Sequence, residues 1–138
     1  MDKVVLVDTG PIVAALDKRD DNHGWASQMF QGLRVSCLTC EAVVSECFFL
    51  LEHLQDGNTR LIQMLARGVI RVAFDFEDSR QETLHLLRRY RDTPMSFADG
   101  CLIRMSEMFP NSSVFTADSD FVVYRRFGRQ VIPLISPW

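Results

Sequence analysis

The sequence predicts an α/β fold built around a parallel β-sheet, and three observations support this prediction. Short β-rich runs alternate with longer helical patterns along the chain, as they do where helices connect parallel strands. The β-rich runs are almost continuously apolar, which is typical of strands covered on both faces. Turn-forming residues separate the runs, for example at residues 56–58 and 92–94.

Five segments have the composition of strands: residues 4–7, 34–38, 70–74, 113–116 and 131–134. Helical patterns fill the remaining intervals: residues 11–16, 23–31, 41–54, 59–67, 78–91, 97–108 and 120–127. We find no internal repeat, low-complexity tract or linker. We therefore expect a single domain that spans residues 1–138, a length sufficient to bury a substantial core.

The composition is that of an ordinary soluble globular protein, with 47% hydrophobic and 24% charged residues. The apolar run at residues 4–7 is too short for a signal peptide, and no later segment is long enough to cross a membrane. We therefore expect a cytoplasmic protein with no membrane segment. Its cysteines are then expected to be reduced thiols: Cys37, Cys40, Cys47 and Cys101.

The basic residues are mainly arginines. The formal net charge is −3, so the overall charge of the chain does not indicate a nucleic-acid partner. Lys3 and Lys18 are the only lysines, and arginine suits phosphate groups better than lysine does. Two clusters supply the candidates for RNA binding: Arg88, Arg89, Arg125 and Arg126. Solvated helix faces explain these clusters equally well, so they permit RNA binding without demonstrating it.

Two acidic residues follow predicted strands directly. Asp8 comes after the first strand and Asp118 after the fourth, each before a turn or helix. In open α/β sheets, ligands bind beyond the carboxyl ends of the strands where the strand order reverses. Helix N-capping is the alternative for each residue, because Asp is a common N-cap.

Glu46 and Asp99 stand within apolar patterns of predicted helices. The neighbours of Glu46 three and four positions away are apolar: Ala42, Val43, Phe49 and Leu50. A buried carboxylate is costly unless an arginine or a metal ion compensates its charge. Asp99 shares a helix face with Met95, Leu102 and Ile103, although with Ser96 it also fits a capping box. Gly100 beside it costs the helix roughly 1 kcal/mol relative to Ala, which a close approach of another backbone segment or of a ligand would explain.

Together the four acids are more informative than each alone. Two of them end strands and two lie on inward helix faces, so all four are expected to converge. A site of carboxylate oxygens suits Mg²⁺ or Mn²⁺, because hard cations prefer oxygen ligands. Such ions promote phosphodiester hydrolysis by activating water and stabilising the leaving oxygen.

Four segments resemble the acidic blocks of PIN domains, and the VapC-like branch is the most similar. They are VDTGP at 7–11, EAVVSE at 41–46, PMSFAD at 94–99 and FTADSDF at 115–121, and the segment YRRFGRQVIPL at 124–134 also fits. The resemblance covers essentially the whole chain. One departure is Gly100, where this branch often has Ala.

The resemblance implies a three-layer fold whose parallel five-stranded sheet has the order 3-2-1-4-5. It also implies RNA cleavage that depends on Mg²⁺ or Mn²⁺, frequent homodimers and often an inhibiting antitoxin protein. By position, the catalytic and metal-binding residues would be Asp8, Glu46, Asp99 and Asp118. Asp120 would assist, and Thr9 and Thr116 would orient the carboxylates through hydrogen bonds.

Other interpretations remain open. Cys37 and Cys40 form a CxxC pair after a strand, but a thioredoxin-like role would leave the acids unexplained. A toxin or housekeeping endoribonuclease is the leading hypothesis. A catalytically weak PIN-like module that binds RNA or protein is the second, and a metal phosphatase or DNA nuclease is the third.

Overall fold

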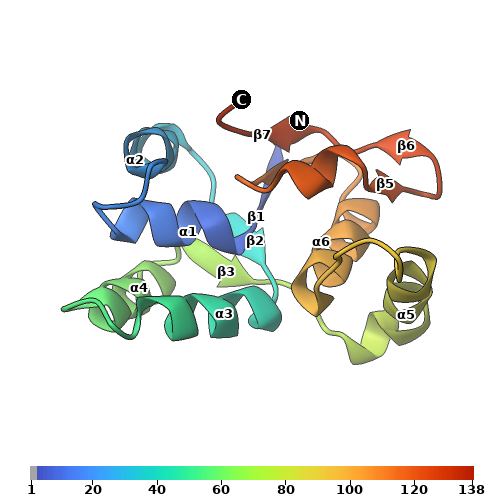
Figure 1. Cartoon of the computed structure of the whole chain (residues 1–138), viewed down its shortest axis with the longest axis horizontal. Helices are drawn as coiled ribbons and strands as arrows, with labels where there is room; N and C mark the ends of the chain where they lie inside the picture. The colour runs from blue at the N-terminus through green and yellow to red at the C-terminus, as the bar shows by residue number, and fades with distance from the viewer. Residues whose placement is uncertain (1–2) are drawn as a thin grey trace.

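A computed structural model describes residues 3–138 and places a five-stranded sheet at the centre of the chain (Figure 1). The strands are β1 (Val4–Val7), β2 (Cys37–Thr39), β3 (Ile70–Val72), β4 (Ser112–Phe115) and β7 (Leu134–Ile135). Their order is β3-β2-β1-β4-β7, and every neighbouring pair is parallel. The predicted α/β class and sheet order are confirmed, with β7 as the fifth strand of the sheet.

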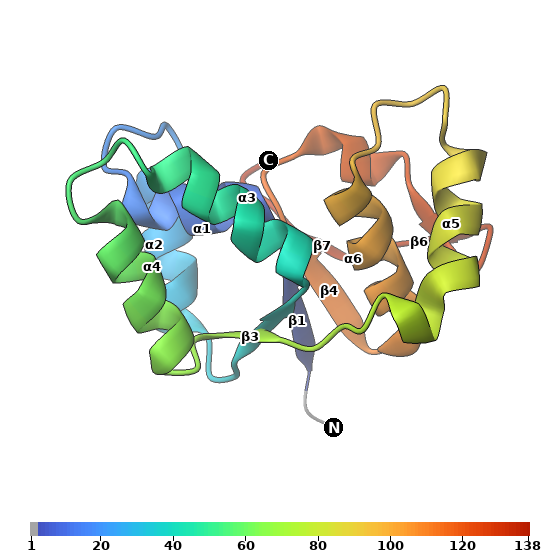
Figure 2. The ribbon, with the colours of Figure 1, turned by 90° about the horizontal axis from the view of Figure 1, so that it is seen from below.

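In the described part of the chain, six α-helices flank the strands: α1 (Thr9–Leu16), α2 (His23–Gly32), α3 (Glu41–Leu51), α4 (Gly57–Ala66), α5 (Arg80–Arg89) and α6 (Phe97–Met108). Two short 3-10 helices add to them: η1 (Glu77–Ser79) and η2 (Ser119–Val122). Helices α1–α4 gather on one side of the strands, and α5 and α6 lie on the other (Figure 2). Within residues 3–138, no helix has the length and apolar character needed to cross a membrane.

The apolar strands form the core. In β1, Leu6 and Val7 are fully buried, and in β4 Phe115 is fully buried. Trp25 and Phe30 of α2 pack on the Phe115 ring with centroid distances of 5.2 and 5.1 Å. Burial of each large apolar side chain stabilises the fold by roughly 1.5–3 kcal/mol, which fixes the central strands that carry the acidic residues.

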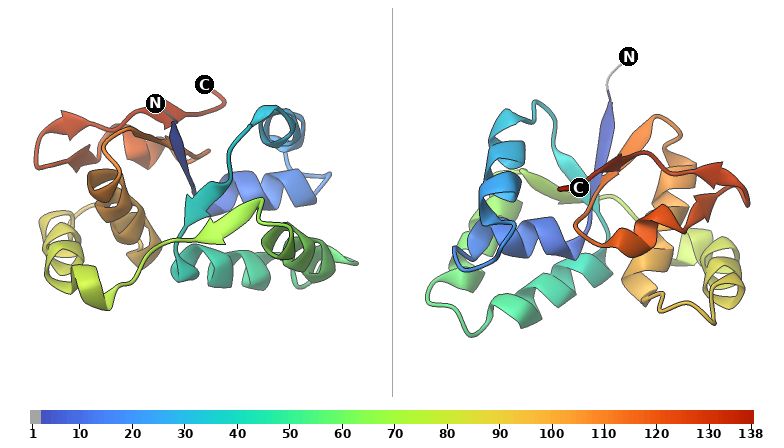
Figure 3. Two further views of the ribbon diagram at one scale, coloured as in Figure 1. Left: turned by 180° about the vertical axis from the view of Figure 1, so that it is seen from behind. Right: turned by 45° about the horizontal axis from the view of Figure 1, so that its top comes forward.

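The predicted helix at residues 120–127 is wrong. η2 ends at Val122, and β5 (Arg125–Arg126) then pairs antiparallel with β6 (Gln130–Val131). Phe127 (φ 53°) and Gly128 (φ 80°) adopt left-handed backbone conformations, which end a helix and suit a tight turn. The predicted last strand at 131–134 is accordingly divided between β6 and β7. Figure 3 shows the resulting hairpin projecting from the sheet beside α6.

The sheet order creates a crevice at the carboxyl end of β1. The chain runs from β1 outward through β2 to β3, and then returns to the other side of β1 with β4. Ligands commonly bind at such a reversal of strand order. Val7 is paired with Phe115, so the next residues, Asp8 and Thr116, leave the sheet side by side.

Candidate metal centre

Asp8 is held at the end of β1 by groups on both sides. Its backbone N–H continues the sheet by donating to the Phe115 carbonyl at 3.0 Å. The carboxylate caps α1, because Oδ1 accepts from the Thr9 backbone N–H at 2.8 Å. Oδ2 accepts from the Thr116 hydroxyl at 2.8 Å. The residue is only 6% exposed, so its two carboxylate oxygens have a fixed direction.

Asp118 is fixed by the same threonine. The Asp118 backbone N–H donates to Thr116 Oγ1 at 2.9 Å. Its own Oδ1 accepts from the Asp120 backbone N–H at 2.9 Å and caps η2. One hydroxyl therefore links the two acids that follow β1 and β4.

Asp99 enters the crevice from α6. Ser96 and Asp99 form a complete capping box: the Asp99 N–H donates to Ser96 Oγ at 3.1 Å, and the Ser96 N–H donates to Asp99 Oδ2 at 3.4 Å. The Tyr124 hydroxyl also donates to Oδ2, at 3.1 Å. The predicted cap is therefore present, and it holds the carboxylate in the crevice.

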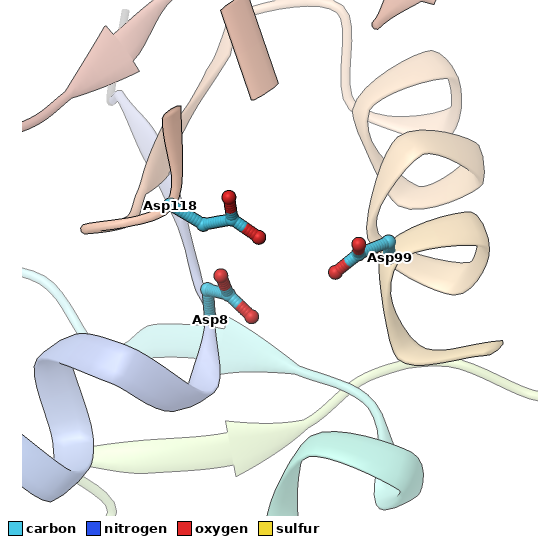
Figure 4. Close-up of side chains that lie close together, drawn as sticks. All are labelled: Asp8, Asp99 and Asp118. Carbon is cyan, nitrogen blue, oxygen red and sulfur yellow. The ribbon is translucent and has the colours of Figure 1, made fainter. Parts of the chain in front are cut away.

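The three aspartates converge. One carboxylate oxygen from each of Asp8, Asp99 and Asp118 lies within 4.8 Å of the others. Figure 4 shows Asp8 and Asp118 extending from the strand ends toward Asp99 on α6. Three oxygens at this spacing suit one divalent cation, since Mg²⁺ and Mn²⁺ bind carboxylate oxygens.

Among residues 3–138, no basic group forms an ion pair with this cluster. The ion pairs within residues 3–138 involve other acids: Asp17, Glu77, Glu82 and Glu107. A buried ion pair with arginine, the alternative explanation for inward-facing acids, is therefore not what the described residues form. The chemistry of the donor set fits a hard cation, which would supply the missing positive charge.

Burial and repulsion between neighbouring carboxylates shift Asp8 and Asp99 toward their protonated forms. Burial raises the pKa of Asp8 to about 7, with smaller contributions from the charges of Asp99 and Asp118, although the bonds from Thr9 and Thr116 oppose the shift. Burial also raises the pKa of Asp99, against the bond from Tyr124. The metal-free site is thus electrostatically strained near neutral pH.

Glu46 lies in the site for a different reason than the sequence suggests. The buried face of α3 consists of Val43, Cys47 and Leu51, whereas Phe49 is 68% exposed. Glu46 is exposed too, so the prediction that it is buried in an apolar stripe is wrong. It nevertheless lines a cavity of about 370 Å³ together with the three aspartates. The structure thus brings three of the four acids into contact distance and places Glu46 on the wall around them.

The residues expected to assist differ in how they act. Thr116 bonds to Asp8 and Asp118 through its hydroxyl. Thr9 bonds to Asp8 through its backbone N–H rather than its side chain. Asp120 supports Asp118 in the same way, through its backbone N–H.

The four arginines considered for RNA binding lie outside the cavity of the acids: Arg88, Arg89, Arg125 and Arg126. Arg126 is only 9% exposed, and its Nη1 donates to the Ser106 carbonyl at 3.2 Å. Nη1 of Arg125 donates to the Val122 carbonyl at 2.7 Å. The surroundings of Arg126 are those of a packing residue, and Arg88 and Arg89 remain exposed on α5.

All four cysteines are buried free thiols. The thiol of Cys40 interacts with that of Cys101 on α6. Burial raises the pKa of Cys37 to about 12, which suppresses the thiolate that redox chemistry requires. The CxxC spacing therefore reflects packing at the start of α3.

Tyr124 and Gly100 complete the support of α6. Sequence reasoning did not identify Tyr124, because its bond to Asp99 depends on how the segment after η2 folds back. Its ring is fully buried between Tyr90 and Phe121. A Cβ at Gly100 would lie 2.9 Å from a Leu87 carbon. The close approach at Gly100 is therefore to the side chain of Leu87 on α5, and not to the backbone or ligand that the sequence suggested.

Thr116→Val is expected to lower the free energy of unfolding by about 1–3 kcal/mol, because it removes the hydroxyl shared by Asp8 and Asp118. Thr83→Val is the matched control. Thr83 is also fully buried, but its Oγ1 has no hydrogen-bond partner within the described chain. Urea unfolding of both variants is the measurement. Equal losses at the two positions would contradict the role given to the Thr116 hydroxyl.

Comparison with known proteins gives a match among solved structures. No family model matches the sequence, and no curated protein matches it. Among solved structures, the chain is similar to VapC20 of Mycobacterium tuberculosis, described as a toxin that cleaves the sarcin–ricin loop. The match has a TM-score of 0.77 and 21% sequence identity, and it covers 94% of this chain and 99% of VapC20. The chain therefore has the PIN-like α/β fold of this toxin structure.

Proposed function

We propose that the protein is a metal-dependent endoribonuclease that hydrolyses RNA phosphodiester bonds with Asp8, Glu46, Asp99 and Asp118. The observation that carries this proposal is the convergence of three carboxylates within 4.8 Å, two of them buried and that of Asp118 half-buried, with no arginine or lysine of residues 3–138 paired to them. Such a cluster is costly in an apo protein. A bound cation would neutralise the carboxylates and could then promote phosphodiester hydrolysis.

Mg²⁺ and Mn²⁺ are the cations that fit the site. Asp8, Asp99 and Asp118 would hold the ion. The Thr116 hydroxyl would keep the Asp8 carboxylate and the Asp118 backbone in place. Such an ion acts as a Lewis acid that polarises a phosphoryl oxygen and lowers the pKa of water. Glu46 is exposed on the cavity wall. We assign its carboxylate the role of accepting a hydrogen bond from water in the site.

The proposed substrate class comes from the fold neighbour. VapC20 is described as a toxin that cleaves the sarcin–ricin loop, and its match to nearly the whole chain supports RNA as the substrate here. We extend the proposal to a cytoplasmic toxin inhibited by an antitoxin protein and active as a homodimer. Exposed apolar side chains such as Phe49 (68%) and Val131 (67%) offer surface for protein partners.

The test is cleavage of defined RNA by protein purified free of any inhibitor. A hairpin with the sarcin–ricin sequence and an unstructured RNA of equal length are incubated with Mg²⁺, with Mn²⁺ or with excess chelator. We expect metal-dependent cleavage at discrete positions and none with chelator. Undiminished cleavage in chelator would contradict the metal mechanism. Binding of RNA without cleavage under every condition would favour the catalytically weak binding module.

A further inference from the structure

A second cavity, of about 530 Å³, lies between α3 and α6 next to the candidate metal centre. The two cavities share these helices. Ala42 lines the second cavity, and Glu46, one helical turn further along α3, lines the first. On α6, Phe97 and Cys101 line the second cavity, whereas Asp99 lines the first. Asp99 lies between Phe97 and Cys101 in the sequence of α6, so the two cavities flank the same part of this helix.

The walls of the second cavity are aromatic. Phe97 of α6 is 47% exposed, and its ring contacts that of Phe76 with a centroid distance of 5.4 Å and an interplanar angle of 65°. Phe74 adds a third ring to the lining. The buried thiols of Cys40 and Cys101 belong to the same lining and act as small apolar groups. Such a surface suits a flat, polarisable ligand rather than an ion.

Carboxylates supply the polar part of the lining, and no basic residue belongs to it. Glu77 is paired with Arg80 at 2.6 Å, and Asp75 Oδ1 accepts from the Glu77 backbone N–H at 3.0 Å. Glu41 is exposed, and its side chain forms no hydrogen bond or ion pair with the residues described. The cavity thus disfavours phosphate and offers a free acceptor to a ligand that donates hydrogen bonds.

We propose that this cavity binds a guanine base of the RNA strand, adjacent to the phosphodiester at the acids. The inference rests on the proposed ribonuclease function. Unstacked RNA bases commonly stack on aromatic side chains and are read along their hydrogen-bonding edges. Guanine presents two neighbouring donors, N1–H and N2–H, which match the two oxygens of Glu41. Uracil presents one donor between two carbonyls, which the carboxylates repel.

Binding can be measured without catalysis. Amide NMR spectra are recorded in chelator, which removes any metal-held phosphate, during titration with guanosine, adenosine or uridine monophosphate or with ribose 5-phosphate. We expect guanosine monophosphate to shift the amides of Phe76, Phe97 and Cys101 at the lowest concentration. Ribose 5-phosphate should leave these amides unchanged. Equal shifts with uridine monophosphate, or no shift with any nucleotide, would overturn the proposal.

Two variants with matched controls locate the contacts. Phe97→Leu keeps an apolar side chain but removes the ring, and should weaken guanosine monophosphate binding by about 5- to 150-fold, the usual range for loss of one stacking ring. Phe49→Leu, on an exposed position that lines neither cavity, should bind guanosine monophosphate as the wild type does.

Glu41→Gln should reduce the preference for guanosine over uridine monophosphate, and Glu52→Gln should not. Unchanged binding and preference in Phe97→Leu and Glu41→Gln would refute the assignment.

The same variants separate this inference from the proposed function. If the wild type cleaves RNA and Phe97→Leu cleaves it equally well at every junction, the base site is wrong and the ribonuclease stands. If guanosine monophosphate binds as expected but no RNA is cleaved with either metal, the base site stands and the ribonuclease proposal fails.

Discussion

Asp118→Asn is expected to lower the rate of RNA cleavage by roughly 100-fold or more while leaving the fold intact. Asn keeps the side-chain oxygen that accepts from the Asp120 N–H, so the cap of η2 survives. The substitution removes a negative charge that would help to hold the proposed cation, and loss of a ligand to a catalytic metal removes transition-state stabilisation. Initial cleavage rates at saturating Mn²⁺, together with the circular dichroism spectrum, provide the measurement.

A second test compares Glu46 with a matched control, Glu52. Glu46→Gln should also slow cleavage, because its carboxylate lines the cavity of the aspartates. Glu52→Gln makes the same chemical change at another exposed position next to α3, and Glu52 does not line that cavity, so its rate should match the wild type. Equal activity of the Asp118→Asn and wild-type proteins would show that cleavage, if present, occurs elsewhere.

The second large effect concerns stability without metal. The pKa of Asp8 is raised to about 7 in the folded protein from an ordinary value of 3.8. A carboxyl group with a raised folded-state pKa stabilises the fold fully below pH 3.8, and this stabilisation is lost as the pH rises through 7. For Asp8 the loss is on the order of 4 kcal/mol. In chelator, Asp8→Asn should therefore gain stability relative to the wild type as the pH rises from 5 to 8.

Urea unfolding at several pH values tests this expectation. Asn retains an acceptor for the Thr9 N–H, and the Thr116 hydroxyl can accept from its amide. Asp21→Asn is the control, because Asp21 is exposed and its substitution removes one charge outside the site. A stability difference between Asp8→Asn and the wild type that stays constant from pH 5 to 8 would mean that Asp8 is only a helix cap.

Much of the fold was predictable because apolar runs mark the buried strands and turn residues mark the breaks between elements. α6 begins and ends as predicted, since Ser96 and Asp99 form the capping box that the sequence indicates. Residues 120–127 were not predictable, because the helical pattern does not reveal the left-handed backbone at Phe127. A local pattern cannot specify where a chain reverses to form a hairpin.

The candidate site was predictable where it depends on topology. Asp8 and Asp118 follow strands that pair directly, so their proximity follows from the sheet order. The apolar neighbours of Glu46 led to the wrong prediction that Glu46 is buried, because Phe49 belongs to the surface rather than the core. The Tyr124–Asp99 bond joins residues 25 positions apart, and no local pattern predicts such a contact.

The most direct test of the proposed cation site is the stability of wild type and Asp8→Asn at pH 8 with increasing Mn²⁺. A ligand that binds only the folded state stabilises it by about 2.7 kcal/mol at a hundred times its dissociation constant. We predict that the wild type gains this stability and overtakes Asp8→Asn, which gains much less because one ligand is missing. An equal gain in both proteins, or no gain in either, would contradict a cation site formed by Asp8, Asp99 and Asp118.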